Sequence, residues 1–263
     1  MNDDLTPDPW QALRRLTQAR IALGRSGASV PTKAQLAFQL AHAQARDAVH
    51  TELDVAALSA SLHELGPECI AVHSAAADRQ VYLQRPDFGR KLDDASRAAL
   101  SAMMGSAGGF DLSLVIADGL SARAVAQNAL PFLRLLLPRL SQQGWSLAPT
   151  AIASQGRVAI GDEIAAALKA RAVLVLIGER PGLSSPDSMG LYLSWEPHVG
   201  MTDAQRNCIS NVRPAGLSYA AAADKLHYLL TEARRRGLSG IALKEEAPQD
   251  DAPLARASNF LLG

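Results

Sequence analysis

The chain has 263 residues, of which 48% are hydrophobic and 20% are charged, so its composition is globular rather than disordered. Its 26 Lys and Arg residues balance its 26 Asp and Glu residues, and a formal net charge of zero argues against nucleic acid as a partner. No apolar run approaches the ~18 residues of a membrane helix, and the N-terminus does not resemble a signal peptide. Two cysteines, Cys69 and Cys208, indicate a reducing, cytoplasmic location.

Helical patterns dominate the first quarter of the chain. Apolar residues recur at helical spacing over residues 10–23, 32–49 and about 55–65. Gly66-Pro67 is a strong stop signal for the third of these helices. No convincing strand pattern occurs before residue 68, so we predict an all-helical N-terminal segment over residues 1–67.

From residue 68 onward, short apolar runs alternate with helical patterns. The predicted strands lie at about 68–73, 111–117, 145–154, 173–177 and 192–194, and the predicted helices at about 92–104, 122–128, 131–140, 162–170 and 219–236. This alternation predicts an α/β fold with a doubly wound, largely parallel, Rossmann-like sheet over residues 68–263. The acidic, proline-containing segment after Lys244 is predicted to be a loose tail.

The strongest single pattern is the stretch Val173–Leu183. Five apolar residues run directly into Gly178, which is typical of a strand buried on both faces. Glu179 and Arg180 follow at the C-terminal end of this strand, where open α/β sheets bind their ligands. Glu179 is therefore a candidate ligand-binding carboxylate. The alternative is an ordinary loop ion pair between Glu179 and Arg180.

Three loops that follow predicted strands are expected to converge on one site. They are Asp118–Ser121, Arg157-Val158 and Glu179–Gly182, and Cys208–Asn211 is a candidate fourth segment. The chain has no glycine-rich dinucleotide or triphosphate motif, no zinc-ligand spacing and no nucleophile-elbow motif. No histidine or basic residue is obviously placed to activate Cys208 as a nucleophile. The sequence therefore predicts a ligand site without a self-contained catalytic set.

Several uncommon strings then occur in a recognisable order. They are Gly24–Gly27, Leu83–Arg90, Ser113–Ser121, Gly156–Val158, Val175–Leu183 and Cys208–Asn211. Together they resemble the small (light) subunit of ethanolamine ammonia-lyase over nearly the whole chain. The resemblance implies a lyase subunit that pairs with a large, barrel-shaped subunit in a higher hetero-oligomer. It also implies that adenosylcobalamin binds between the two subunits, and that ethanolamine is converted to acetaldehyde and ammonia by a radical mechanism.

The resemblance also implies roles for individual residues. Val158, Glu179 and Cys208 match the positions at which the family contacts the cofactor. No catalytic residue is assigned to this chain, because the resemblance places the substrate residues in the large subunit. The segment around His63 has Ser61 where a cobalt-binding motif needs aspartate, so the lower ligand of cobalt is expected to be the cofactor's own dimethylbenzimidazole.

Two rival functions and one open question of location accompany this interpretation. The chain could be a freestanding Rossmann-like enzyme or binding protein for a nucleotide-like ligand at the same loops. It could also be a purely structural assembly subunit that never touches the cofactor.

Many relatives carry a long N-terminal extension that helps to send the complex to a bacterial microcompartment. This chain begins almost at its first predicted helix, which counts against such targeting.

Overall fold

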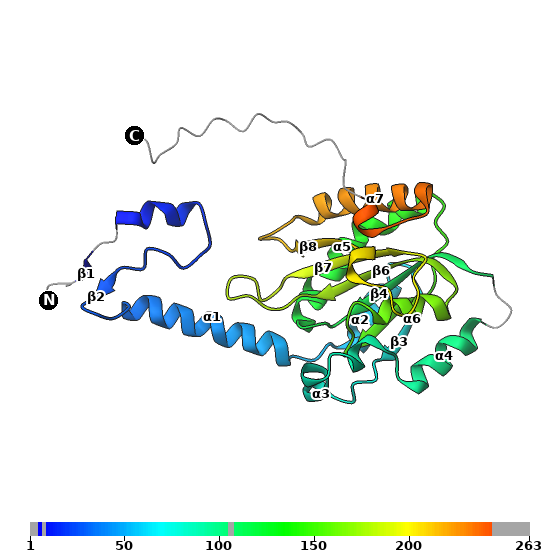
Figure 1. The fold of residues 1–263 in the computed structure, drawn as a ribbon, viewed down its shortest axis with the longest axis horizontal. Helices are drawn as coiled ribbons and strands as arrows, with labels where there is room; N and C mark the ends of the chain where they lie inside the picture. The colour runs from blue at the N-terminus through cyan, green and yellow to red at the C-terminus, as the bar shows by residue number, and fades with distance from the viewer. Residues whose placement is uncertain (1–4, 7–8, 105–107, 244–263) are drawn as a thin grey trace.

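A computed structural model of the protein describes residues 5–6, 9–104 and 108–243. It contains a six-stranded sheet with the strand order β3-β5-β4-β6-β7-β8 (Figure 1). The strands are β3 (Cys69–His73), β4 (Phe110–Ala117), β5 (Thr150–Ser154), β6 (Ala170–Gly178), β7 (Met189–Trp195) and β8 (Asn207–Val212). The first four are parallel, and β7 and β8 extend the sheet antiparallel. The predicted α/β fold with a mostly parallel sheet is confirmed.

Helices cover both faces of this sheet (Figure 1). They are α1 (Thr32–His50), α2 (Val55–His63), α3 (Arg79–Gln84), α4 (Asp94–Met104), α5 (Ala122–Gln142), α6 (Ile160–Ala167) and α7 (Tyr219–Arg236). Helices α2, α5 and α7 pack into a hydrophobic core on one face, and α4 and α6 into a second core on the other. Within the described residues, no helix carries an apolar stretch long enough to cross a bilayer.

The central strands supply side chains to both cores. In β4, Leu114 and Ile116 contribute to the core with α5, whereas Val115 and Ala117 contribute to the core with α6. All four side chains are fully buried. A strand that is buried on both faces needs apolar residues at every position, which is why its sequence is a continuous apolar run rather than an alternation.

Helix α5 corrects one sequence prediction. A break between two helices was predicted at Pro131, but α5 is continuous and contains both Pro131 and Pro138. Each proline removes one backbone donor, yet Phe132 and Leu136 of the same helix are fully buried. Burial of such side chains stabilises by about 1.5–3 kcal/mol each, which offsets that loss. Ser121 caps the helix, because its Oγ accepts a hydrogen bond from the Ala124 N–H at 3.2 Å.

The N-terminal segment is only partly helical. Helices α1 and α2 confirm two predictions, but the helix expected over residues 10–23 is reduced to a 3-10 helix, η1 (Pro9–Arg15). Beside it, β1 (Leu5–Thr6) pairs antiparallel with β2 (Arg25–Ser26), so the all-helical prediction was wrong for this part. Trp10 and Leu16 are exposed, and a short helix without a packed apolar face is only marginally stable.

Two other predicted boundaries are also corrected. The strand predicted from residue 145 begins only at Thr150, after Pro149, which has no N–H to donate to a ladder. Cys208 lies within strand β8. The sequence had predicted no strand there, only a segment from Cys208 that ends in a loop. Short 3-10 helices complete the fold at Phe88–Arg90 (η2), Asp203–Gln205 (η3) and Gly240–Ala242 (η4). The predicted tail after Lys244 lies outside the described residues.

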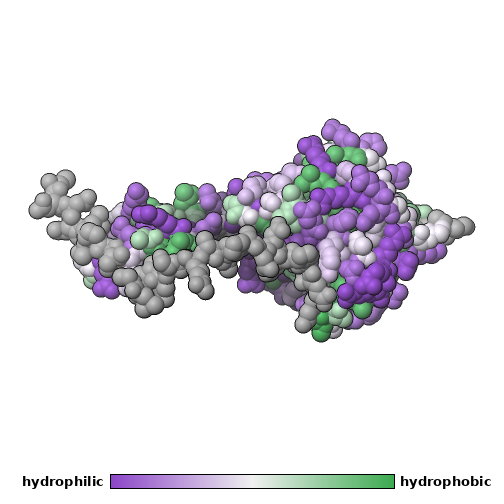
Figure 2. Space-filling view, turned by 90° about the horizontal axis from the view of Figure 1, so that it is seen from above, coloured by the Kyte–Doolittle hydropathy of each residue, from purple (hydrophilic) through white to green (hydrophobic). Residues whose placement is uncertain are grey.

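Helix α1 carries the N-terminal residues away from the body of the molecule (Figure 1). Its second half packs through Ala41, Ala45 and Ala48, which are buried. Its first half exposes large apolar side chains, and we call residues 9–40 the N-terminal arm. Apolar surface is visible on this arm in Figure 2.

A buried ion pair fixes the connection between β7 and β8. The two terminal nitrogens of Arg206 each lie 2.6 Å from one carboxylate oxygen of Asp162 on α6. The same guanidinium also donates to Ser194 Oγ at 2.9 Å and to the Met201 carbonyl oxygen at 3.0 Å. Both charged side chains are 2% exposed, so each depends on the other for compensation of its buried charge.

We expect Asp162→Ala to lower the free energy of unfolding by about 3–5 kcal/mol, because it removes the buried counter-ion of Arg206 and leaves only the exposed Asp203 carboxylate, 3.9 Å from Nε. Urea denaturation followed by circular dichroism measures this loss. The matched control is Asp224→Ala, which removes an exposed partner of Arg139 and should cost less than about 1 kcal/mol. Similar losses for the two variants would contradict the importance given to the buried pair.

Candidate functional site

The loops that follow β4, β5 and β6 meet at the carboxyl edge of the sheet. The Asp118 carboxylate, directly after β4, accepts hydrogen bonds from the backbone N–H groups of Gln155 at 2.9 Å and Gly156 at 3.0 Å. The Leu120 N–H donates to the Gly178 carbonyl oxygen at 2.9 Å. The predicted convergence of the three loops is therefore confirmed.

Glycine makes this close approach sterically feasible. A Cβ atom on Gly119 would clash with the carbonyl oxygen of Gly178, and a Cβ on Gly178 would clash with that of Ser121. Gly119 also has a φ of +59°, in the left-handed region that favours glycine. The chain leaves β4 toward α5 on one face and β5 toward α6 on the other. A change of face between adjacent strands is where open α/β sheets form a ligand crevice.

Two of the three residues implied by the family resemblance line one cavity, and the third lies on a neighbouring strand. Val158 and Glu179 line a space of about 340 Å³ at this edge, together with Tyr82, Arg157 and Tyr192. Cys208 lies directly opposite Tyr192 in the ladder between β8 and β7. The structure therefore brings together residues that are 50 positions apart in the sequence, counted from Val158 to Cys208.

Glu179 is held by hydroxyl and backbone donors rather than by a cation. Ser188 Oγ and Ser210 Oγ donate to its two carboxylate oxygens at 2.5 and 2.6 Å. The Asn211 N–H approaches the carboxylate at 3.3 Å. No ion pair of Glu179 occurs in the described part of the chain, so the predicted alternative of a loop ion pair with Arg180 is not observed. A carboxylate has about four acceptor positions, so one remains for a ligand.

The environment of Cys208 disfavours a nucleophilic role. The residue is exposed, but local burial of the thiol raises its pKa by more than a hydrogen bond with Tyr192 lowers it, and the nearby Glu179 carboxylate adds a smaller increase. A raised pKa reduces the thiolate fraction, and the thiolate is the reactive form. The thiol is suited to contact a ligand and not to attack one.

Sequence analysis missed Tyr82, which forms one wall of the cavity. Its ring lies under two guanidinium groups, with the central carbon of Arg79 at 4.7 Å and that of Arg157 at 4.2 Å from the ring centre. Its hydroxyl donates to the Gly156 carbonyl oxygen at 3.1 Å. The sequence predicted no helix at residues 79–84, where α3 lies. Asp78 was the available signal, because it accepts from the Val81 N–H at 2.8 Å as an N-cap.

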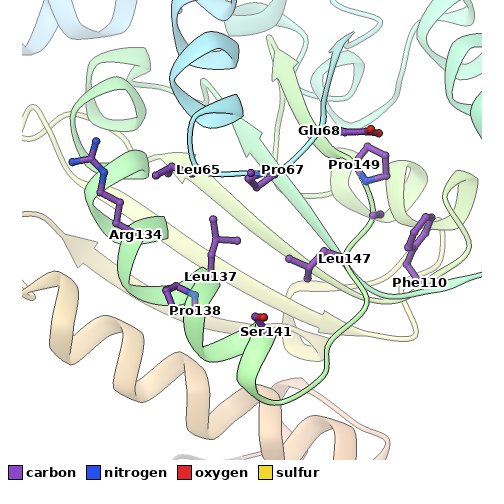
Figure 3. A pocket seen from close by; sticks show the side chains of 12 residues that line it. Leu65, Pro67, Glu68, Phe110, Arg134, Leu137, Pro138, Ser141, Leu147 and Pro149 are labelled. Atoms are coloured by element: carbon purple, nitrogen blue, oxygen red, sulfur yellow. The ribbon is translucent and has the colours of Figure 1, made fainter.

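A second cavity lies at the opposite, amino-terminal edge of the sheet (Figure 3). It has a volume of about 650 Å³ and is lined mainly by apolar side chains, including Leu65, Phe110, Leu137 and Leu147. It offers apolar contact without a converging set of polar groups. A ligand with hydrogen-bonding groups is better matched by the carboxyl-edge cavity.

The fold and site define an α/β domain with a candidate ligand crevice and, among its described residues, no cluster of metal ligands. The model of the ethanolamine ammonia-lyase light-chain family matches residues 7–244, so the chain belongs to this family. A small subunit of ethanolamine ammonia-lyase from Ralstonia nicotianae is 59% identical, with 98% of this chain and 96% of the relative covered. A protein of the same name from Pseudomonas paraeruginosa is 57% identical, with 100% of this chain and 99% of the relative covered. Another from Azotobacter vinelandii is 59% identical, with 98% of this chain and 97% of the relative covered.

We expect the Cys208 thiol to alkylate with a midpoint above the ordinary cysteine pKa of about 8.5, because its pKa is raised. The measurement is the rate of iodoacetamide modification against pH in a Cys69→Ala chain, where Cys208 is the remaining cysteine. A midpoint below the ordinary value would indicate an activated thiolate and would contradict the contact role.

Proposed function

We propose that this small subunit helps a large subunit to bind adenosylcobalamin, and that the complex converts ethanolamine to acetaldehyde and ammonia by a radical mechanism. One observation carries the proposal. Val158 and Glu179, two of the three residues that the family resemblance implies as cofactor contacts, line a single cavity, and the third, Cys208, pairs with the cavity residue Tyr192 on the neighbouring strand. This convergence of residues from separate segments on one crevice is hard to reconcile with a purely structural subunit.

The residues present fit part of a cobalamin. The free acceptor position on Glu179 suits the amide N–H groups or ribose hydroxyls of the cofactor. Val158 is half-buried beside it and offers apolar contact. A cavity of about 340 Å³ is near the lower limit for a drug-sized ligand. Because cobalamin is much larger than such a ligand, a second protein surface has to cover the rest.

The chain's own part in the reaction is binding and orientation. When bound, adenosylcobalamin supplies a carbon-centred radical by cleavage of its cobalt–carbon bond. Glu179 fixes the cofactor by accepting hydrogen bonds, and the Cys208 thiol and Val158 exclude water from its flank. The lower ligand of cobalt is proposed to be the cofactor's own dimethylbenzimidazole. No residue of this chain is assigned a role at the reacting atoms.

The N-terminal arm supports the association with a large subunit. Leu16, Leu36 and Leu40 are 74%, 59% and 61% exposed, and clustered apolar side chains on a surface mark protein interfaces. The arm also contacts the loop after β6, where Arg20 donates to the Leu183 carbonyl oxygen at 3.2 Å. The arm and the rim of the cavity therefore belong to one connected part of the surface, which a single partner could cover.

The direct test of the proposed function is reconstitution. We expect the purified chain with adenosylcobalamin to release no acetaldehyde from ethanolamine, and the addition of the large subunit to restore the reaction. Acetaldehyde is followed by a coupled dehydrogenase assay. Deamination by the chain alone would support the freestanding-enzyme alternative and would contradict the proposal.

Glu179 should contribute strongly to cofactor affinity in the assembled complex. We expect Glu179→Ala to raise the dissociation constant of adenosylcobalamin about 10- to 150-fold, because hydrogen bonds to charged groups contribute about 1.5–3 kcal/mol. Glu179→Gln keeps one oxygen acceptor and should lose less.

Titration followed by the visible absorbance of the cofactor measures these constants. The control is Glu64→Ala, which removes an exposed carboxylate at the end of α2, away from the cavity. Unchanged affinity in both Glu179 variants would remove this residue from the proposed binding site.

The exposed apolar side chains of the arm should stabilise the complex. We expect Leu36→Asp and Leu40→Asp each to weaken binding of the large subunit at least tenfold, since central apolar contacts commonly contribute more than 1 kcal/mol. Surface plasmon resonance against immobilised large subunit measures the change. Leu135→Asp is the control, because Leu135 is 40% exposed on α5 of the body. Loss of binding in the control alone would place the interface elsewhere.

A further inference from the structure

Arg157 is a cation at the cavity that forms no ion pair with any residue that the structure describes. It lines the carboxyl-edge cavity and also an adjoining cavity of about 630 Å³. No carboxylate lies within ion-pair distance of its guanidinium in the residues that the structure describes. Its Nη2 makes a single long contact of 3.4 Å with the Tyr82 carbonyl oxygen. Its Nε is buried without a partner, whereas Nη1 is solvent-accessible and makes no hydrogen bond to a described residue.

Arg79, whose guanidinium also contacts the Tyr82 ring, has the partners expected of an arginine with a structural role. Its Nε donates to the Val49 carbonyl oxygen at 2.6 Å, and its Nη1 donates to that of Gly119 at 2.8 Å. It also lies 3.8 Å from the Asp118 carboxylate, which compensates its charge. Arg157 shares the aromatic contact with Arg79, but among the described residues its guanidinium has a single, long carbonyl contact and no carboxylate within ion-pair distance.

The position of Arg157 is nevertheless well defined. Its backbone N–H donates to the Gly89 carbonyl oxygen at 2.7 Å. A Cβ on Gly89 would lie 2.9 Å from Arg157 Cγ, so glycine leaves room for the side chain to pass. The guanidinium then stacks on the Tyr82 ring. Arg157 also lies three residues before the first residue of α6, where the positive end of the helix dipole adds to its charge. A fixed, uncompensated cation of this kind is suited to bind an anion.

We propose that Arg157 binds the phosphodiester of the cobalamin nucleotide loop, an inference that rests on the proposed function. The peripheral side chains of cobalamin are uncharged amides, so the phosphodiester is the one anion at its periphery. A guanidinium offers two parallel N–H donors that match phosphate oxygens. The Glu179 carboxylate lines the same cavity but forms no ion pair with Arg157 among the described residues.

The test compares two truncated cofactors that differ by a phosphate. Adenosylcobinamide phosphate carries the phosphate without the nucleotide base, and adenosylcobinamide lacks both. Their affinities for the assembled complex are measured by absorbance titration in wild type, Arg157→Met and Arg157→Lys. The control is Arg123→Met, which removes an exposed arginine in the first turn of α5 that lines neither cavity.

We expect wild type to bind the phosphate-bearing analogue at least tenfold more tightly. Arg157→Met should abolish this preference and leave the affinity for adenosylcobinamide within threefold of wild type. Arg157→Lys should retain part of the preference, because it keeps the charge but loses the paired donors. The Arg123→Met variant should behave as wild type.

Other outcomes separate the failure of this inference from that of the proposed function. An equal loss for both analogues in Arg157→Met would show that the arginine only supports Tyr82, and would overturn the inference. An unchanged preference in that variant would do the same. If adenosylcobalamin itself fails to bind the wild-type complex, the proposed function fails, and the phosphate assignment fails with it.

Discussion

The buried carboxylate of Asp118 is the constraint on which the carboxyl edge depends. It is 3% exposed, and its two oxygens receive the N–H groups of Gln155 and Gly156 while Arg79 supplies the nearby positive charge. Burial raises the pKa of this carboxyl group, and the two backbone donors and Arg79 oppose that shift. These contacts hold Gln155 at a φ of 56°, a conformation unusual for a residue with a side chain. Arg157 comes directly after Gln155 and Gly156 in the chain, so the contacts of Asp118 also position the turn that carries Arg157.

Glu179 has a corresponding role at the antiparallel side of the sheet. Its carboxylate joins the end of β6 to Ser188, before β7, and to Ser210 on β8. Thus β8, an edge strand, is brought beside the crevice that the parallel strands create. One acidic residue therefore organises the rim of the crevice, and we propose that its remaining acceptor position binds the ligand. A variant at this position should be tested for folding as well as for ligand affinity.

The sequence predicted the parts of the fold that depend on local pattern. The apolar run before Gly178 identified β6, and the order of the strand ends identified the loops of Asp118, Arg157 and Glu179. The continuity of α5 through Pro131 was missed because it depends on burial against the sheet, which local signals do not encode. The donors to Glu179 were missed because Ser188 and Ser210 reach it through strand pairing. The cofactor roles of Val158, Glu179 and Cys208 came from resemblance and stay predictions.

Hydrogen–deuterium exchange of the assembled complex with and without adenosylcobalamin tests the central claim most directly, because it reports where the cofactor binds without relying on activity. The account predicts slower amide exchange in residues 156–158, 178–180 and 208–211 when the cofactor is added. It predicts no comparable change around the cavity at the amino-terminal edge, for which residues 65–68 serve as an internal reference. Protection confined to the large subunit, with all three segments of this chain unchanged, would contradict the account.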